Sequence, residues 1–592
     1  MEIAAAALQF TTVAVQAFRG CILAIEFFST AQHMGADGDL LRTGLEFEKY
    51  RLVMWANRVG LLNDKEHQTI NWQLAGLFLQ QLESFLTSAT ELRTRYTLDV
   101  TEAEVEAAQE TQAVEGQKRG VAALIARLKP NLRTMAGKII QEHNSPIKRV
   151  RWAARDRGKL KAFLHEISAL VDKLQVLLDS SERQAEKNDY EKLLRSVISL
   201  TTTAAEAGQV KEFLDDGLYN GRKSQHAINA AAYLKQVRLV LGADRRDDEV
   251  TPKLASDTAG LKMPRLSILG RSLAPWGGAS LYEHNLEFAT YHKKQVLVQW
   301  KLVPSTQWER YTTQMKRLAV FIMSLSDKSF RSLPCLGYYP LEAQGRHGIM
   351  YSIPTPGRDS PNPENSTTDW DLRTLKSLIS DKPLASLRRR LELARSLAET
   401  VLQLHTAGWL HKNLRSENFV FLAPRGSTDD VFLAAEPYVI GYEYARSDTE
   451  EAAIAFTQLP DTEIEADLYR HPKARGPGRE TYQKRFDLYA VACVAIELVM
   501  WQPLADVFAR YVTANLKEMM DIAQASGEVI ELPTLGQLFE KEEATKVLRY
   551  QAGDAVLEVI KMCYTVGRRD PEDELSLTVQ NAAVDKLAWC QI

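Results

Sequence analysis

The spacing of apolar residues changes near residue 250, and this change constrains the fold of the 592-residue chain more than any other feature. Up to about residue 241, apolar side chains recur at three- and four-residue steps, which is the pattern of amphipathic helices. Residues 242–264 are polar and charged with two prolines, as in a linker. Short strand-like runs at 295–301 and 348–353 follow, and then long helical stretches. The sequence therefore predicts a multidomain protein, with an N-terminal all-α bundle and a C-terminal α+β fold.

Composition and charge narrow the classes of partner. Hydrophobic residues at 45% and charged residues at 25% are ordinary values for globular proteins, and the length exceeds that of a single core. The net charge of -3 gives no reason to expect nucleic-acid binding. The five cysteines are scattered without metal-ligand spacing, so we expect a reducing compartment and no metal site.

The N-terminal segment combines strong apolarity with an early charge. Residues 3–18 are 16 uncharged residues, fewer than the roughly 20 that a spanning helix needs, and Arg19 ends the run. Glu2 argues against the positive start of a signal peptide. The residues alone leave two alternatives, a buried core helix or a segment that can partly enter lipid. The candidate membrane-active side chains are Leu8, Phe10, Val13 and Phe18.

A basic window lies farther along the helical half. Residues 148–161 carry a net charge of +6, with one acid, Asp156. Such a run usually forms a solvated face, but beside a membrane-seeking helix it could attract anionic lipid. The lipid-contact candidates are Lys148, Arg149, Arg151 and Arg155.

The sharpest local motif is His411-Lys-Asn-Leu-Arg-Ser-Glu-Asn418, which follows a helical run and precedes a short apolar run. It resembles the catalytic loop of protein kinases, in which a His-Arg-Asp motif is followed five residues after the Asp by a metal-binding Asn. Asn413 stands at the position of the catalytic Asp, and an amide cannot accept the proton of a substrate hydroxyl. The resemblance therefore implies a loop without its base.

The other kinase positions are also degenerate. Gly441 stands at the metal-binding Asp of the Asp-Phe-Gly motif, so the resemblance implies the loss of a second catalytic carboxylate. It assigns nucleotide binding to Lys301, Asn418, Gly277 and Gly278, although the glycine-rich loop is poor. We expect no required cofactor. ATP is the candidate ligand, with weak or no dependence on magnesium.

The positions that stabilise the kinase fold match the kinase pattern better than the catalytic positions do. The resemblance implies that His411 and Asp487 belong to the kinase core, with Asp487 buried against the backbone of the catalytic loop. It thus predicts a bilobal protein-kinase-like fold over residues 262–592 that is a pseudokinase rather than an enzyme. Arg415-Ser416 and Gly441-Tyr442-Glu443 are similar to the pseudokinases of mixed-lineage kinase domain-like proteins, which join this fold to a membrane-permeabilising helical bundle.

The N-terminal half has a resemblance of its own. Gly35, Asp39 and the spacing of Leu45, Leu52 and Trp55, with a second match at 147–178, resemble the fungal HeLo domain of prion inhibition and propagation. This implies a dormant effector at 1–205, joined by a helical brace and linker at 206–261 to the pseudokinase. In that family, the first helix leaves the bundle and enters a membrane.

The two resemblances together predict a regulated cell-death effector of the heterokaryon-incompatibility or innate-immunity type. We expect a cytoplasmic protein, released by an unknown upstream receptor or signalling protein, that self-associates and moves to anionic lipids of the plasma membrane without binding nucleic acid. Two alternatives stay open at this point. The chain could be a working kinase that binds ATP and uses Glu443 as an unconventional carboxylate, or a non-catalytic scaffold that binds proteins.

Overall fold

The computed structural model describes residues 2–30, 32–33, 36–62, 70–96, 151–152, 157–215, 223–243, 274–275, 285–303, 305–353, 369–381, 385–448, 464–476, 479–569 and 573–590. It divides into two compact units, Met1–Tyr233 and Leu234–Ile592. This division falls inside helix α10 (Lys223–Ala243). The predicted domain boundaries at residues 205 and 261 stay predictions, because a division by contacts does not show where a piece that folds alone would end.

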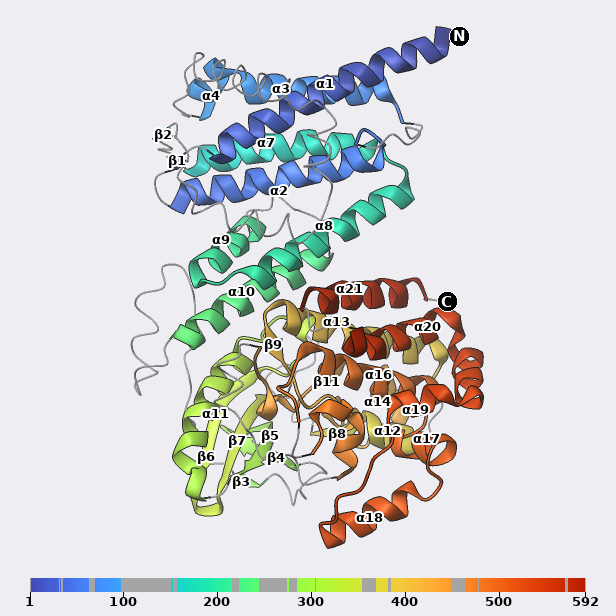
Figure 1. Ribbon diagram of the computed structural model, residues 1–592. Coiled ribbons are helices and arrows are strands. Elements are labelled where there is room, and N and C mark those ends of the chain that lie inside the picture. Colours follow the sequence, from blue (N-terminus) through green and yellow to red (C-terminus); the bar gives the residue numbers. More distant parts are fainter. Residues whose placement is uncertain are drawn as a thin grey trace. The chain divides into compact units, whose positions relative to one another are not determined.

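The first unit is helical, as the sequence predicts. Helices α1 and α3 lie side by side in one layer, and α2 and α7 lie side by side in the next (Figure 1). One short parallel strand pair, β1 with β2, accompanies them. The elements are α1 (Glu2–Thr30), β1 (Gln32–His33), α2 (Ala36–Arg58), α3 (Trp72–Thr87), α4 (Ala89–Tyr96), β2 (Arg151–Trp152), α7 (Arg157–Val176), α8 (Ser180–Leu200) and α9 (Ala204–Asp215).

Helix α7 shows how the apolar period builds this core. The predicted face is buried except for Leu177, which is half-buried and packs against the core. Full burial of one such side chain contributes roughly 1.5–3 kcal/mol. The buried members are Leu160, Phe163, Leu164, Ile167, Leu170, Val171, Leu174 and Leu178.

A buried ionic cluster ties α2 to α7. The guanidinium of Arg51 donates to Glu48 at 2.9 Å and to the hydroxyl of Ser168 at 3.0 Å, and it pairs with Asp172. Burial alone would lower the pKa of Arg51, but the two carboxylates outweigh it and raise that pKa. Removing either carboxylate would leave a buried charge poorly compensated, which is strongly destabilising.

The second unit begins with strands and continues with helices, in the predicted order. Its antiparallel five-stranded sheet has the order β3-β4-β5-β7-β6, and α11 packs beside it. The runs predicted at 295–301 and 348–353 are strands β5 and β7. The elements are β3 (Ala274–Pro275), β4 (Leu286–Tyr291), β5 (Lys294–Leu302), α11 (Trp308–Met323), β6 (Cys335–Leu341) and β7 (Arg346–Ser352).

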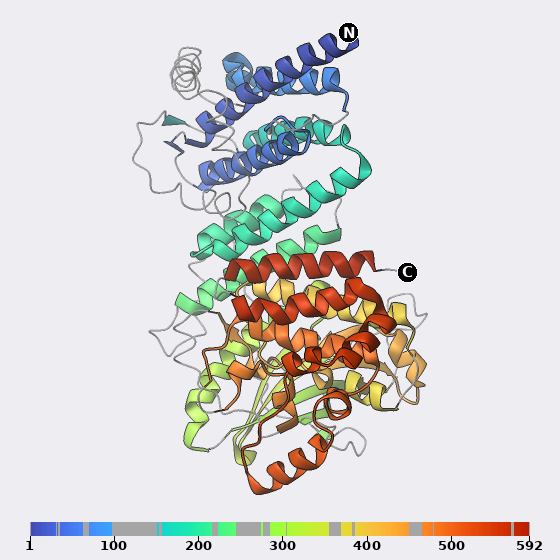
Figure 2. The same cartoon turned by 45° about the vertical axis from the view of Figure 1, so that its right-hand side comes forward.

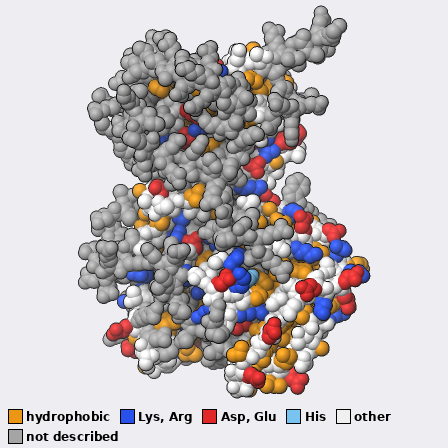
Figure 3. Space-filling view, in the orientation of Figure 1, with side chains coloured by type: hydrophobic (Ala, Val, Ile, Leu, Met, Phe, Trp, Pro, Cys, Tyr) orange, Lys and Arg blue, Asp and Glu red, His pale blue; other side chains and the backbone are white. Residues whose placement is uncertain are grey.

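The rest of the second unit is mainly helical (Figure 2), and several of its helices pack against α16. A small antiparallel sheet of order β11-β10-β8 lies among these helices. On the face shown in Figure 3, acidic and basic side chains are interspersed over this unit. The longer elements are β8 (Trp370–Thr374), α12 (Leu375–Asp381), α13 (Leu387–Thr406), β10 (Phe419–Pro424), β11 (Pro437–Val439), α16 (Lys484–Met500), α17 (Leu504–Tyr511), α18 (Leu516–Ser526), α20 (Glu542–Arg569) and α21 (Asp573–Trp589).

Helix α16 is almost entirely buried, and two of its buried side chains are carboxylates, Asp487 and Glu497. A buried carboxylate needs partners, so these two residues locate the polar interior of the unit. The predicted linker beyond residue 243 and the predicted loop at 354–365 lie outside the described residues.

Candidate functional site

Helix α1 is the candidate membrane element of the first unit. It continues through Arg19 to Thr30, so the charge that was expected to end the apolar run does not end the helix. Among the described residues, one straight helix is long and apolar enough to cross a membrane, over Thr12–Ser29. About 50% of this window is buried inside the protein, as in a core helix. Length and burial together leave both of the alternatives drawn from the sequence open.

The structure places the candidate membrane-active side chains differently. Phe18 is buried, whereas Val13 is half-buried, and the side chains of Leu8 and Phe10 lie outside the described residues. The thiol of Cys21 donates to the carbonyl of Leu79 on α3 at 3.3 Å. The buried face of the helix consists of Ala14, Ala17, Phe18, Cys21, Ile22, Ile25 and Phe28.

The charged residues of α1 have specific surroundings. The carboxylate of Glu26 lies 3.9 Å from the ammonium of Lys49 on α2, and Lys49 also pairs with Glu46 at 2.7 Å. Arg19 is half-buried. In the bundle, therefore, one of the two charges that oppose membrane insertion already has a partner.

The predicted basic lipid contact can be placed only in part. Lys148, Arg149 and Arg155 lie outside the described residues. Arg151 begins β2, where it pairs with Gln32 of β1, but its side chain is not described. Lipid contact by this window stays a prediction.

In the second unit, Asp487 braces the loop that contains the kinase-like motif. Its carboxylate accepts the backbone N–H groups of His411 at 2.8 Å and Lys412 at 2.9 Å, and the hydroxyl of Tyr482 at 2.8 Å. His405 lies 3.0 Å from the same carboxylate. Burial alone would raise the pKa of Asp487, but the hydrogen bond and charge of His405 lower it below its usual value. These bonds hold Lys412 in a left-handed backbone conformation with φ 68°.

Asn413, Asn418 and Gly441 come together at the next point along the loop. The amide of Asn418 donates to the carbonyl oxygen of Asn413 at 2.8 Å. Gly441 has φ 90°, and a Cβ there would lie 2.5 Å from the amide nitrogen of Asn418. The amide of Asn413 donates to the carboxylate of Glu443 at 3.1 Å. Glu443, the carboxylate of the working-kinase alternative, thus has a specific contact with Asn413.

Lys301 reaches the same turn from the sheet. Its ammonium lies 3.5 Å from the ring centroid of Tyr444, a cation–π contact. Gln299, two residues earlier on β5, accepts the backbone N–H of Gly441 at 3.3 Å. The turn Tyr442–Tyr444 therefore contacts both Lys301 and Asn413. Gly277 and Gly278 lie outside the described residues.

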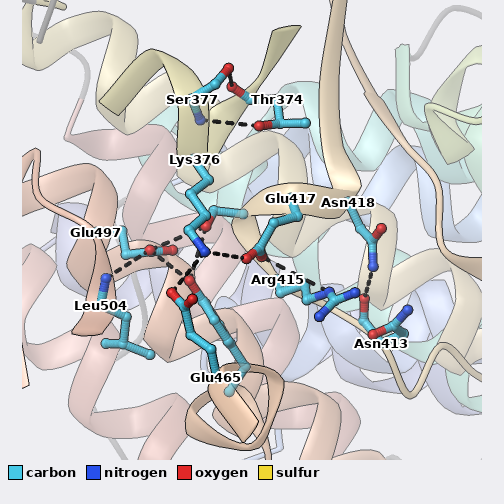
Figure 4. Close-up of polar contacts among 12 residues, drawn as sticks. Thr374, Lys376, Ser377, Asn413, Arg415, Glu417, Asn418, Glu465, Glu497 and Leu504 are labelled. Carbon is cyan, nitrogen blue, oxygen red and sulfur yellow. Dashed lines mark hydrogen bonds and ion pairs between the residues drawn. The ribbon is translucent and has the colours of Figure 1, made fainter. Parts of the chain in front are cut away.

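An ionic cluster extends this site towards α12 (Figure 4). The ammonium of Lys376 lies 2.9 Å from Glu417 and 2.7 Å from Glu465. Burial alone would lower the pKa of Lys376, but the two carboxylates raise it. Arg415 is buried, and its guanidinium lies 3.9 Å from Glu417. Sequence reasoning missed Lys376 and Glu417, because no local pattern joins residues so far apart.

Glu497 holds the last part of the network together. One of its oxygens accepts from Ser416 at 3.1 Å, Tyr469 at 2.7 Å and the backbone of Leu504 at 2.9 Å (Figure 4). Burial raises the pKa of Glu497 to about 8. A charged residue within an apolar run of the sequence could have identified Glu497 as a buried carboxylate.

The described contacts of this site join the His411 loop to α16 and to the turn Tyr442–Tyr444. The base position presents an amide, and Lys301 lies against an aromatic ring. Among the residues that the structure describes, no cluster of His, Cys, Asp and Glu side chains could hold a metal ion. Lys301 and Asn418 both contact other groups of this unit, and nucleotide binding by them stays a prediction.

Comparison with known proteins supports the reading of the first unit. Residues 7–202 match the family model of HeLo, described as prion-inhibition and propagation. This match covers α1 from residue 7 onward and ends shortly after α8. A comparison with curated proteins finds no match to the chain.

Proposed function

We propose that this protein is a regulated membrane-permeabilising effector of the fungal cell-death type. The observation that carries the proposal is the state of α1, a helix apolar enough to cross a membrane that lies docked within a region matching the HeLo model. Its buried face packs against α2 and α3, and Glu26 is paired with Lys49. Docking hides the apolar surface that insertion would use, so release of α1 is the activating step.

The second unit is the regulatory part in this proposal, a kinase-like domain without phosphotransfer. Support comes from Asp487 bracing the His411 loop and from the amide at Asn413. The strands followed by helices are in keeping with a bilobal kinase-like fold. In this scheme an upstream receptor or signalling protein acts on this unit. The effector then self-associates and moves from the cytoplasm to anionic lipids of the plasma membrane.

Dye release from liposomes tests the effector function. The predicted effector domain, residues 1–205, should release dye from vesicles containing phosphatidylserine. The same domain with Ala5→Glu should release little, because the change adds a charge to the apolar run of residues 3–18, and a charge in an inserting segment opposes insertion. Circular dichroism checks that both proteins are helical. Equal release by the two proteins would leave α1 as an ordinary core helix.

A further inference from the structure

Helix α3 carries an exposed apolar strip beside α1. Leu77 is 53% exposed and Leu74 is 38% exposed, although the opposite face of α3 is buried in the core. Phe78, four residues after Leu74, is half-buried beside them and packs against the same core. We name Leu74, Leu77 and Phe78 the α3 strip. Aromatic and aliphatic side chains of this kind, with one side free, suit the boundary between water and lipid.

The strip lies within an uncharged stretch. Residues 68–82 contain no Asp, Glu, Lys or Arg, and Glu83 is the only charged residue of α3. Burial raises the pKa of Glu83, which favours its neutral form. A carboxylate tip of Glu83 lies against Gly20 of α1, where a Cβ would meet it at 1.7 Å. The one acid of the helix is therefore turned towards α1.

A cationic side chain borders the strip. The exposed Lys173 on α7 has its ammonium 5.8 Å from the ring centroid of Phe78. Helices α1 and α3 run in the same direction (Figure 1), and Cys21 contacts Leu79. An apolar strip with a cation at its edge matches an anionic bilayer in both hydrophobicity and charge.

We propose that the α3 strip is a docking surface for an anionic lipid bilayer. It holds the bundle at the membrane before α1 inserts, an inference that rests on the membrane function proposed above. The strip is continuous with the helix proposed to insert, because α1 and α3 pack along one another. Docking and insertion are thereby separate steps carried by neighbouring helices.

Vesicle co-sedimentation of the full chain tests the docking step. Leu77→Asp should weaken binding to vesicles of phosphatidylcholine with phosphatidylserine by about tenfold or more, because it places a charge at the lipid boundary. Leu77→Gln should weaken it less. The matched control is Val176→Asp, a change at another exposed apolar residue of the same unit, 66% exposed, which should bind as the unchanged chain does. Helix content by circular dichroism should be equal in all of them.

The outcomes separate docking from insertion. The Ala5→Glu chain should still bind vesicles but release no dye, whereas the Leu77→Asp chain should do neither. If Leu77→Asp binds as well as the unchanged chain, docking by the α3 strip is wrong, even when Ala5→Glu abolishes dye release. If instead Ala5→Glu leaks normally while Leu77→Asp fails to bind, the insertion of α1 is wrong and docking stands. Unchanged binding with a smaller oligomer in light scattering would mean that a second copy covers the strip, which also overturns the proposal.

Discussion

Replacing Ile22 with alanine tests whether packing in the bundle restrains α1. Ile22 is 0% exposed on the buried face of the helix. Truncation of a buried isoleucine to alanine typically costs about 2–5 kcal/mol. In the inserted state the same change removes at most about 0.6 kcal/mol of the favourable free energy of transferring the side chain from water to the membrane. The docked state therefore loses more than the inserted state by at least about 1.4 kcal/mol, a shift of roughly tenfold towards the membrane.

The assay is dye release by the full chain at limiting protein concentration. Ile22→Ala should reach the same release at about one tenth of the protein concentration or less. Leu23→Ala is the matched control, because Leu23 is half-buried and loses a similar membrane transfer with less packing. Its release should change little.

Circular dichroism and thermal melting must show that the Ile22→Ala bundle is still helical. With that condition met, release no faster than that of the unchanged chain would refute the reasoning. The burial of α1 would then be ordinary core packing, and its apolarity would have no connection with membranes.

The remaining predictions concern the second unit. Purified residues 262–592 with radiolabelled ATP and magnesium should show background phosphate incorporation, and incorporation that Lys301→Ala abolishes would contradict the pseudokinase proposal. Asp487→Ala leaves buried N–H donors without an acceptor, at about 1–3 kcal/mol, so the melting temperature should fall; an unchanged value would count against the bracing role. Glu497 has a pKa of about 8 in the folded state, against 4.5 for an ordinary Glu. Between these two pH values the folded state still binds a proton that the unfolded state has released. The free energy of unfolding therefore falls as pH rises through this window. From pH 6 to 9 this group should cost about 3 kcal/mol, and Glu497→Gln should remove that dependence in urea unfolding at the two pH values; equal pH dependence in both proteins would exclude it.

Much of the first unit follows from local sequence. The period of apolar residues in 160–178 is enough to define the buried face of α7, because burial on one side of a helix requires that spacing. The same rule could not predict whether Val13 is buried or exposed, because α1 is apolar on almost all of its faces. Its half-buried state depends on which neighbours cover it, and those lie on other helices.

The second unit shows more clearly which contacts the local sequence cannot predict. The motif at 411–418 and Asp487 could be placed from their order along the chain, and the structure brings them together through backbone hydrogen bonds. The contacts of Lys376 with Glu417 and Glu465, and of Lys301 with Tyr444, join residues that are distant in sequence. Many residues of the chain have the charge or aromatic ring needed for such a contact. Only the folded structure determines which of them meet. The kinase resemblance also says nothing about Glu497, because its partners come from three separate segments.

The two charges of α1 bear on how an inserted helix could persist. An Arg at the centre of a membrane helix opposes insertion by roughly 2.5–3.5 kcal/mol, and Glu26 would also lose Lys49 on leaving the bundle. Arg19 and Glu26 are seven residues apart, so they lie on the same side of the helix but about 10.5 Å apart along it, too far to pair within one helix. Pairing between neighbouring copies would satisfy both charges at once. We therefore expect insertion to depend on self-association, and cross-linking of vesicle-bound protein should capture oligomers; a purely monomeric population at full dye release would exclude this dependence.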